Sequence, residues 1–309
     1  MEITILGTES LGARGLSCMV EIANRKILID PGMALGYRRH GLLPHPMQVA
    51  VGEQISQRIL TALSDATDVV ISHYHGDHVP LVDANPYQID ARQAVPRCKQ
   101  ICIWAKGPEG ISSQMVTRRE ALGKLLGKDF PNVEGRSDDV LSLSVPMHHG
   151  EPHTKLGMLM MTRIEADGTV FVHASDIQLL DEQAVSLILN WEPDIALVGG
   201  PPLYLSDFMN QQRRQMAWQQ AIRLAQDIET LILDHHLLRC EAGLVWLDHL
   251  SSKVNRRVIC AADFMQQPRC LLEATRRQLY EEMPVPKGWH EAYARGEVDT
   301  QPYRDHACR

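Results

Sequence analysis

The chain has 309 residues, of which 44% are hydrophobic and 22% are charged, and its formal net charge is −7 at pH 7. A chain of this length and hydrophobic content can bury a sizeable core, and no apolar run approaches the roughly 20 residues of a membrane span. The negative charge disfavours nucleic-acid backbone as the main partner, although it permits a local basic groove. The N-terminus is strand-like rather than a basic and then apolar leader, so we expect a cytoplasmic protein whose seven cysteines are reduced thiols.

Short apolar segments separated by Gly, Pro, Asn and Asp predict strands through the first half of the chain. A buried strand is predicted at residues 69–71, and His73, His75, Asp77 and His78 follow it directly. Two histidines at i and i+2 can turn toward one metal ion from a tight loop, while the aspartate and the third histidine can serve a second ion. The spacing therefore predicts a dinuclear metal site at the end of this strand.

Later elements are predicted from their hydrophobic periodicity. Residues 100–104 have the pattern of a strand. Apolar stripes predict helices at residues 112–128, 207–228, 241–254 and 268–283.

The His73–His78 segment resembles the signature motif of the metallo-β-lactamase-fold hydrolases. Four further parts of that superfamily's pattern are matched in order, at residues 3–8 with 26–32, 144–152, 169–176 and 230–236. Asp30 ends the second strand of the implied opening hairpin, where it would orient the metal ligands. The resemblance assigns His73, His75 and His149 to a first ion, Asp77, His78 and His235 to a second ion, and Asp176 to both.

The resemblance also implies an α/β fold, a four-layer αββα sandwich spanning residues 1–240. Within it, residues 79–140 are expected to be an insertion that forms part of the pocket rim. Residues 241–309 are expected to be a helical C-terminal extension packed on this domain. More narrowly, segments 9–14, 71–75, 199–204 and 233–239 resemble an uncharacterised branch of predicted hydrolases that is notable in archaea.

Two motifs contain adjacent histidines, so His148 and His236 are rivals to His149 and His235 as ligands. Whichever member of each pair is not a ligand could donate a proton to a leaving group. Asp77 could also orient the attacking water. The candidate catalytic residues are therefore Asp77, His236 and His148.

Four other residues are candidates with weaker support from the sequence. His153 and His173 are less favoured as ligands, because His173 precedes Asp176 on a strand and could point into the core. Tyr204 follows a Gly/Pro turn after a predicted strand, where it either packs in a rigid turn or reaches substrate. Arg239 is a candidate for anion binding.

The predicted ions define the chemistry that we expect. Two divalent ions, with zinc favoured and manganese or iron also fitting, would be bridged by Asp176 and a hydroxide and would catalyse hydrolysis. The leading substrate is a small phosphodiester or another anionic ester, and a thioester or lactone is the alternative. An iron-dependent thiol dioxygenase and a non-catalytic metal-binding module are hypotheses of other classes.

The expected partner is a small, anionic substrate molecule, without a membrane. Nucleic acid is disfavoured because the chain lacks a long insertion like the nuclease cap of RNA-processing members, and homo-oligomerisation is left open. Paired arginines are interpreted as solvated helix faces, although any pair that lined the site would favour a phosphorylated or acidic substrate. These pairs are at residues 38–39, 118–119, 213–214, 256–257 and 276–277.

Overall fold

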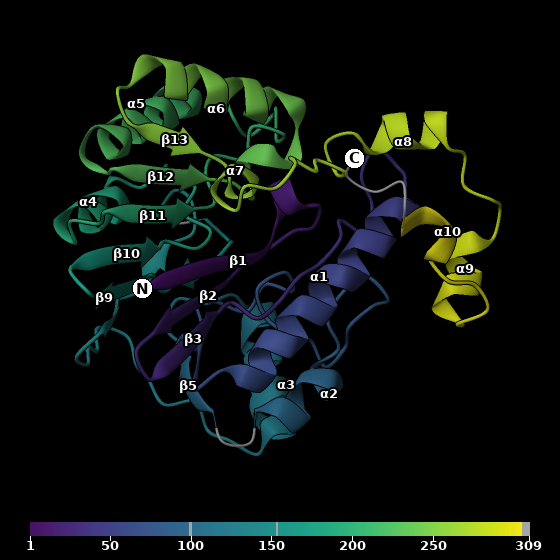
Figure 1. Ribbon diagram of the computed structural model, residues 1–309, viewed down its shortest axis with the longest axis horizontal. Helices are drawn as coiled ribbons and strands as arrows, with labels where there is room; N and C mark the ends of the chain where they lie inside the picture. The colour runs from purple at the N-terminus through teal and green to yellow at the C-terminus, as the bar shows by residue number, and fades with distance from the viewer. Residues whose placement is uncertain (99–100, 153, 305–309) are drawn as a thin grey trace.

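The computed structural model describes residues 1–98, 101–152 and 154–304, which fold into two packed β-sheets with helices on both outer faces (Figure 1). The predicted four-layer αββα sandwich is confirmed. Within the described residues, no helix combines the length and the hydropathy needed to cross a membrane.

The first sheet has five strands, in the spatial order β1-β2-β3-β4-β5. Its first three strands are antiparallel, and β4 and β5 join in parallel. The helices α1 (Pro46–Asp65), α2 (Ala91–Ala94) and α3 (Ser113–Leu126) lie on its outer side (Figure 1). The strands are β1 (Glu2–Thr8), β2 (Leu16–Ile22), β3 (Arg25–Ile29), β4 (Asp68–Ile71) and β5 (Cys102–Ala105).

The second sheet has six strands, in the order β13-β12-β11-β10-β9-β6, and the first four of these are parallel. The helices α4 (Glu182–Asn190), α5 (Gln211–Asp227) and α6 (Glu241–Lys253) lie on its outer side (Figure 1). The strands are β6 (Leu141–Leu143), β9 (Thr162–Ala166), β10 (Thr169–His173), β11 (Ile195–Val198), β12 (Thr230–Leu233) and β13 (Arg257–Ile259). A separate two-stranded ladder pairs β7 (Met147–His148) with β8 (Met158–Leu159).

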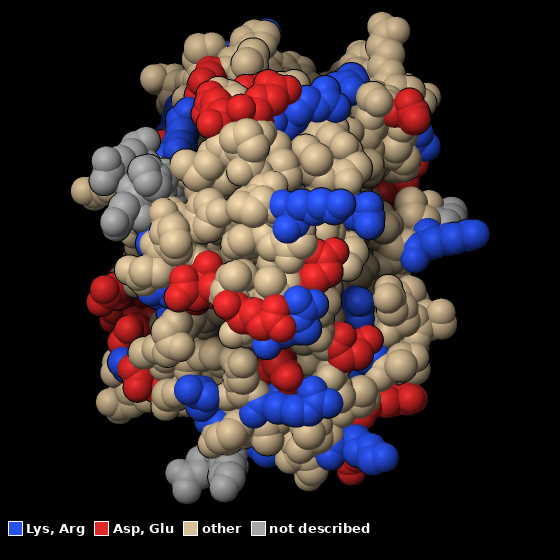
Figure 2. All heavy atoms as spheres, turned by 90° about the vertical axis from the view of Figure 1, so that its right-hand side faces the viewer, with Lys and Arg blue, Asp and Glu red and all other residues tan. Residues whose placement is uncertain are grey.

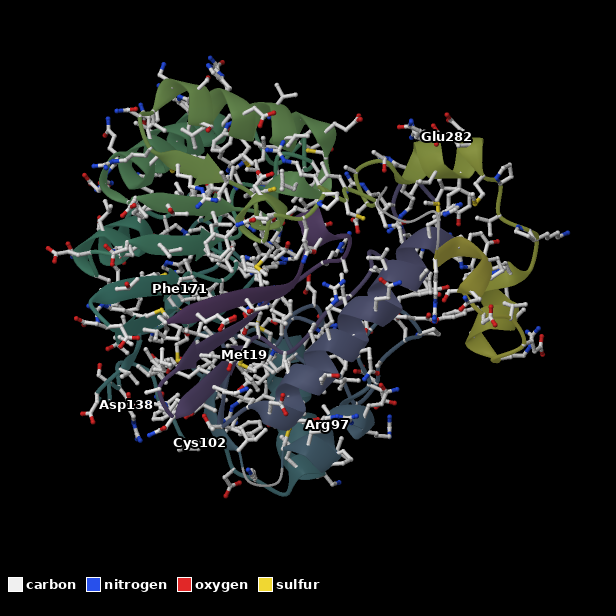
Figure 3. The ribbon with its side chains drawn as sticks, viewed as in Figure 1. Met19, Arg97, Cys102, Asp138, Phe171 and Glu282 are labelled. Carbon is white, nitrogen blue, oxygen red and sulfur yellow. The ribbon has the colours of Figure 1, made fainter. Side chains whose placement is uncertain are left out.

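Alternating side chains of the first sheet belong to two cores. Ile27 and Ile29 pack in the same cluster as Phe171 of the second sheet, whereas Leu28 packs with Ile55 of α1. Figure 3 labels Phe171 on β10 and Met19 on β2, and Met19 belongs to the cluster on the α1 side. Because successive strand residues point to opposite faces, both faces of this sheet are buried.

The predicted elements between residues 79 and 140 are confirmed, with small shifts in their bounds. The helix expected at 112–128 is α3, and the strand expected at 100–104 is β5. Because β5 pairs with β4, this segment contributes an edge strand to the first sheet rather than only loops. Its contribution to a pocket rim stays a prediction.

After residue 240, the helix expected at 241–254 is confirmed as α6, the helix expected at 268–283 is shorter and begins only at Arg276, and a strand is present that the sequence does not predict. β13 pairs in parallel with β12, so the second sheet continues to Ile259. A three-residue strand is too short to give a clear alternation signal. The division of the chain at residue 240 stays a prediction. The helices α7 (Ala261–Phe264), α8 (Arg276–Glu282), α9 (Trp289–Ala294) and α10 (Gln301–Arg304) follow, the last three beside the N-terminal end of α1 (Figure 1).

One cysteine departs from the expectation of reduced thiols. Cys270 is disulfide-bonded, so the prediction is wrong for this residue. Spacing along a chain does not reveal which cysteines approach one another in space. The free cysteines of the described residues are Cys18, Cys98, Cys102, Cys240 and Cys260.

The face shown in Figure 2, which is the right-hand side of Figure 1, carries acidic and basic side chains interspersed with uncharged ones. Charges of both signs are mixed over this face, as on an ordinary solvated surface.

Candidate metal centre

The segment of residues 72–78, which carries the histidine motif and is called the metal loop below, begins directly after β4. His73 and His78 are fully buried, and Tyr74 between them points into the protein, where its hydroxyl donates to the Lys106 carbonyl at 2.7 Å. Arg118 donates to the Tyr74 carbonyl at 3.1 Å. The loop is therefore held in place by contacts that leave its histidines free to converge.

A first cluster consists of His73, His75, His149 and Asp176, whose ligand atoms all lie within 4.8 Å of one another. His73 Nε2 lies 3.1 Å from His75 Nδ1, and His149 Nε2 lies 2.9 Å from Asp176 Oδ2. Four atoms arranged tetrahedrally about a zinc ion would lie roughly 3.4 Å from one another. The spacing of this donor set therefore fits one metal ion.

A second cluster consists of Asp77, His78 and His235, joined by the other oxygen of Asp176. His78 Nε2 and His235 Nε2 lie 3.0 and 3.2 Å from Asp176 Oδ1, and they are 3.4 Å apart. Asp176 Oδ1 is buried and has no hydrogen-bond partner. Such an orphaned carboxylate oxygen among imidazole nitrogens is the chemistry of a metal ligand, so a second ion also fits.

Asp30 forms hydrogen bonds with the metal loop. This is the position that the resemblance implies for it. Its carboxylate accepts hydrogen bonds from the Ser72 amide at 2.8 Å, the Ser72 hydroxyl at 2.6 Å and the Ser175 hydroxyl at 3.1 Å. It also lies 2.8 Å from His78 Nδ1, so a proton on Nδ1 leaves the Nε2 lone pair facing the second cluster. Burial opposes its ionisation, but the hydrogen bond with His78 and the charges of His78, His173 and His73 together outweigh burial and lower the pKa of Asp30.

The structure separates the first pair of adjacent histidines. His149 lies in the first cluster, whereas His148 Nδ1 lies 2.9 Å from Asp181 Oδ2 and belongs to none of the candidate ligand groups of the described residues. The structure therefore does not bring His148 together with the other predicted catalytic residues. Asp181 also caps α4, which ties this imidazole to the helix.

Both members of the second pair reach the site. His235 lies in the second cluster, and His236 Nε2 lies 3.1 Å from Asp176 Oδ2. His236 is 6% exposed, and neither of its ring nitrogens has a hydrogen-bond partner. His236 also shares a candidate ligand group with Asp176 and His235, whereas only His235 groups with Asp77 and His78, so His235 stays the preferred ligand and His236 its rival.

Of the two weaker histidine candidates, His173 is not part of the clusters. His173 Nε2 lies 2.8 Å from the Leu16 carbonyl, on the core side of β10. His153 lies outside the described residues.

Burial and mutual charge set the protonation of the clusters. Burial lowers the pKa of His73 to about 4 and holds the pKa of His75 well below its usual value. For Asp77 and Asp176, burial is outweighed by nearby imidazoles, His78 foremost, which hold both carboxyl pKa values well below the usual range. Neutral imidazoles and ionised carboxylates are the forms that bind metal.

Tyr204 and Arg239, which the sequence singles out, lie beside the second cluster. Arg239 Nη2 lies 2.6 Å from His235 Nε2 and donates to Asp77 Oδ2 at 3.2 Å, and Nη1 donates to the Tyr204 hydroxyl at 3.1 Å. The guanidinium carbons of Arg39 and Arg239 lie 5.4 and 5.6 Å from the Tyr204 ring centroid. Tyr204 thus holds two arginines at the edge of the site.

Sequence reasoning missed a buried charge network next to these residues. Glu9 is 2% exposed, and its Oε2 lies 3.5 Å from Arg239 Nε and 3.6 Å from His235 Nδ1. Glu9 stands directly after the apolar strand β1, and a carboxylate at that position, like Asp30 after β3, is the signal that could have found it.

Glu273 connects the C-terminal segment to this network. It pairs with Arg14, Arg39 and Arg276. Arg276 is fully buried, so the interpretation of the arginine pairs as solvated faces is wrong for Arg39 and Arg276. A pair of arginines in sequence does not reveal the distant glutamate that makes their burial tolerable.

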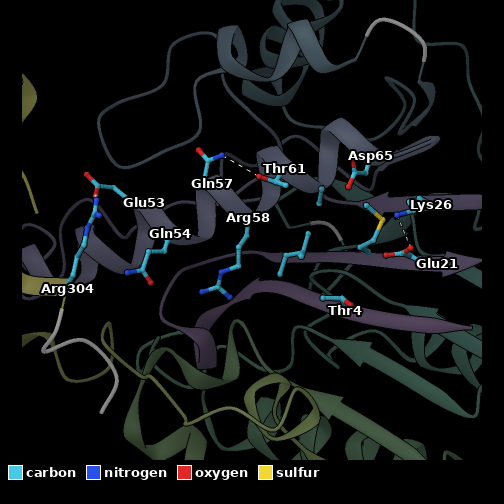
Figure 4. A pocket seen from close by; sticks show the side chains of 13 residues that line it. Thr4, Glu21, Lys26, Glu53, Gln54, Gln57, Arg58, Thr61, Asp65 and Arg304 are labelled. Carbon is cyan, nitrogen blue, oxygen red and sulfur yellow. Dashed lines mark hydrogen bonds and ion pairs between the residues drawn. The ribbon is translucent and has the colours of Figure 1, made fainter. Parts of the chain in front are cut away.

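A groove of about 840 Å³ lies elsewhere, between α1 and the strands β1, β2 and β3 (Figure 4). It shares no lining residue with either cluster. Several of its polar side chains pair with one another, as Glu21 does with Lys26 and Glu53 with Arg304.

Comparison with known proteins gives relatives over the whole chain. Residues 13–159 match the family model of the metallo-beta-lactamase superfamily. A UPF0282 protein of Methanosarcina mazei is 48% identical over 303 residues, which cover 98% of this chain and 99% of that protein. A UPF0282 protein of Methanopyrus kandleri is 33% identical over 292 residues, which cover 90% and 99% of the two chains. Both relatives are archaeal, in agreement with the branch that the sequence segments resemble.

Two solved structures are also similar to this chain. The metallo-beta-lactamase fold protein YhfI from Bacillus subtilis aligns with a TM-score of 0.49 and 13% identity, covering 84% of this chain and 95% of that one. An isothiocyanate hydrolase from Delia radicum gut bacteria aligns with a TM-score of 0.48 and 17% identity, covering 80% and 94%.

Proposed function

The chain belongs to the UPF0282 family, within the metallo-β-lactamase superfamily, and we propose that it is a dinuclear metal-dependent hydrolase of small anionic esters. A phosphodiester is the leading substrate. The observation that carries the substrate class is the arginine network beside the second cluster, where Arg39 and Arg239 flank Tyr204.

The two clusters account for the metal requirement of this proposal. His73, His75 and His149 would hold one ion, Asp77, His78 and His235 would hold the other, and Asp176 would contact both. Zinc is the favoured metal, and manganese or iron also suits imidazole and carboxylate ligands. When bound, the two ions supply Lewis acidity and lower the pKa of water into the neutral range.

Two side chains have the positions needed for proton transfer and orientation. His236 is buried beside Asp176 and has unused ring nitrogens, so it is our candidate to donate a proton to the leaving group. Asp77 lies at the edge of the second cluster, and its Oδ2 can accept from the attacking water. We do not assign this chemistry to His148, because its ring is bound to Asp181.

The charge near the second cluster favours an anionic substrate. Four arginines, at 14, 39, 239 and 276, share two glutamates, Glu9 and Glu273. The Nε atoms of Arg39 and Arg239 are buried without a hydrogen-bond partner. An ester phosphate would supply the missing negative charge and acceptor oxygens.

The substrate class is tested by comparing esters on the metal-loaded protein. We expect a higher kcat/KM for bis-p-nitrophenyl phosphate than for an acyl thioester or an acyl-homoserine lactone. The variant Arg39→Gln should raise KM for the diester about 10-fold and leave kcat nearly unchanged, because it removes a charge-assisted contact. Arg295→Gln, which removes an exposed arginine paired with Glu297, is the matched control.

Faster hydrolysis of the thioester or lactone, with no effect of Arg39→Gln, would contradict the anionic class and favour the alternative esters. Oxygen consumption with a thiol substrate and a single bound iron would instead favour the dioxygenase alternative.

A further inference from the structure

Arg239 contacts the same atoms that would bind the second metal ion. Its Nη2 lies 2.6 Å from His235 Nε2 and 3.2 Å from Asp77 Oδ2. Nη2 also lies 3.2 Å from His235 Nδ1, so the guanidinium faces the side of the imidazole ring, next to the position that a metal ion on Nε2 would occupy. A guanidinium this close to two ligand residues competes with a metal ion for the same space.

The charge of Arg239 adds to this competition. The side chain is 6% exposed, and a buried cation repels another cation far more strongly than it would in water. No comparable group contacts the ligand atoms of the first cluster among the described hydrogen bonds and ion pairs, where Ser72 and Gln178 are the neutral neighbours of His73 and His149. The two metal positions therefore differ in their surroundings, because only the second has a buried positive charge beside it.

Glu9 offers Arg239 another partner. Both oxygens of this buried carboxylate lack a hydrogen bond, and so does Arg239 Nε, although Oε2 and Nε lie only 3.5 Å apart. A small shift of the guanidinium about its Tyr204 contact would close this gap and satisfy both groups. The same shift would move Nη2 away from His235 and Asp77.

His235 itself requires a change of partner when a metal binds it. The Gly15 amide donates to Nδ1 at 3.1 Å, which leaves the proton of a neutral imidazole on Nε2. Metal ligation at Nε2 places the ring proton on Nδ1. Glu9 Oε2, 3.6 Å from Nδ1, is the carboxylate in position to accept it.

We propose that Arg239 gates the second metal position and that Glu9 receives its guanidinium when the second ion binds. The first ion then binds tightly and the second weakly, and an anionic substrate that draws Arg239 away strengthens the second. This inference rests on the proposed function, because it requires that the first cluster bind metal. Arg239 and Glu9 are positioning residues in this scheme.

The test is calorimetric titration of Zn²⁺ into the chelator-treated full chain, which reads each binding step without an activity assay. We expect two steps of unequal affinity in the wild-type protein. Arg239→Gln should tighten the second step about 10-fold, and Glu9→Gln should weaken it by about 10-fold or more, each with the first step unchanged. Arg239→Lys keeps the positive charge and should retain a weak second step, and Arg295→Gln is the unrelated control.

The unchanged first step also shows that each variant is folded. Should Arg239→Gln fail to fold, Glu9→Gln and Arg239→Lys carry the test alone. Two steps of equal affinity in the wild type, or a second step unaffected by both Arg239→Gln and Glu9→Gln, would overturn the gate while leaving the hydrolase proposal intact. If the wild-type protein shows no first binding step, both the role of Arg239 and the hydrolase proposal are contradicted.

Discussion

The two metal clusters differ in how strongly their imidazoles hold a proton. In the first cluster, burial lowers the pKa of His73 to about 4. In the second, burial is outweighed by the Asp176 and Asp30 carboxylates together, which hold the pKa of His78 well above its usual value. A metal ion must displace the proton of His78 but not that of His73 at neutral pH.

We therefore predict that the second ion is lost before the first as the pH falls from 7 to 5. Protons compete with the metal ion for His78, because the pKa of this histidine is raised. His73 stays neutral until the pH approaches its pKa of about 4. Zinc content after dialysis at pH 7, 6 and 5, measured by mass spectrometry, checks this. If both ions are lost together between pH 7 and pH 5, the prediction is wrong.

Neighbouring histidines show where residue-level reasoning from sequence stops. The motif at 73–78 supplies two ligands to each cluster, so its spacing predicts part of both, and the other ligands come from distant segments of the chain. His148 ends β7 and contacts Asp181, whereas His149 follows the strand and lies in the first cluster. His235 and His236 both face the site because His235 has a positive φ of 42°, which breaks the alternation of successive strand residues. A backbone twist of this kind has no reliable signature in the sequence.

At the scale of elements, Glu273 joins the segment before α8 to loops near the metal centre. It pairs with Arg14 and Arg276, and it accepts from the Gly36 amide at 3.2 Å. Burial opposes its ionisation, but these charges, Arg14 foremost, lower the pKa of Glu273 to about 2. The carboxylate is thus more stable in the folded chain than in the unfolded one.

Glu273→Gln should lower the free energy of unfolding at pH 7 by about 3 kcal/mol at most, the value that corresponds to the fall in pKa from 4.5 to about 2. Since the folded pKa is depressed, this stabilisation is complete above about pH 4.5 and disappears as the pH falls toward 2. Urea unfolding at pH 7 and pH 4 measures the difference. Glu297→Gln, at an exposed pair, is the control, and a pH-independent difference would contradict the assignment.

Long elements with strong periodicity are predictable from the sequence, and short ones are not. The helix expected at 207–228 is α5, and its stripe of Ala217, Ala221 and Leu224 is buried as the spacing predicts. β13 is missed because a strand of three residues is too short to show a hydrophobic period. Pairing with β12, rather than local propensity, makes it a strand.

At the scale of the whole molecule, the second sheet crosses the predicted boundary at residue 240. Val258, Cys260 and Ala261 are buried in the main core together with Leu231 of β12. Removing them would expose the edge of β12 and a large apolar surface.

We predict that a chain truncated after Cys240 does not fold cooperatively. Circular dichroism and thermal unfolding of the truncated and full chains check this. A truncated chain that is soluble and unfolds in one sharp transition would show that residues 1–240 are an independent domain after all.

The sandwich as a whole could be predicted because its motifs follow strand ends in a fixed order, and the carboxyl ends of β4, β10 and β12 bring them to one edge. The ion-pair network around Glu273 could not, because it joins residues more than 200 positions apart through side chains with no common pattern. Such long-range pairs are fixed only when the sheets and the C-terminal segment are packed together.

Metal content per chain, measured by mass spectrometry on protein purified without chelator and then dialysed against zinc, tests the central claim most directly. The dinuclear site predicts about two ions per wild-type chain, with loss in Asp176→Ala, because the bridging carboxylate contacts both clusters. Asp167→Asn, at an exposed aspartate, should retain both ions. Wild-type protein that binds no zinc, or an Asp176→Ala variant that keeps both ions, would contradict the account.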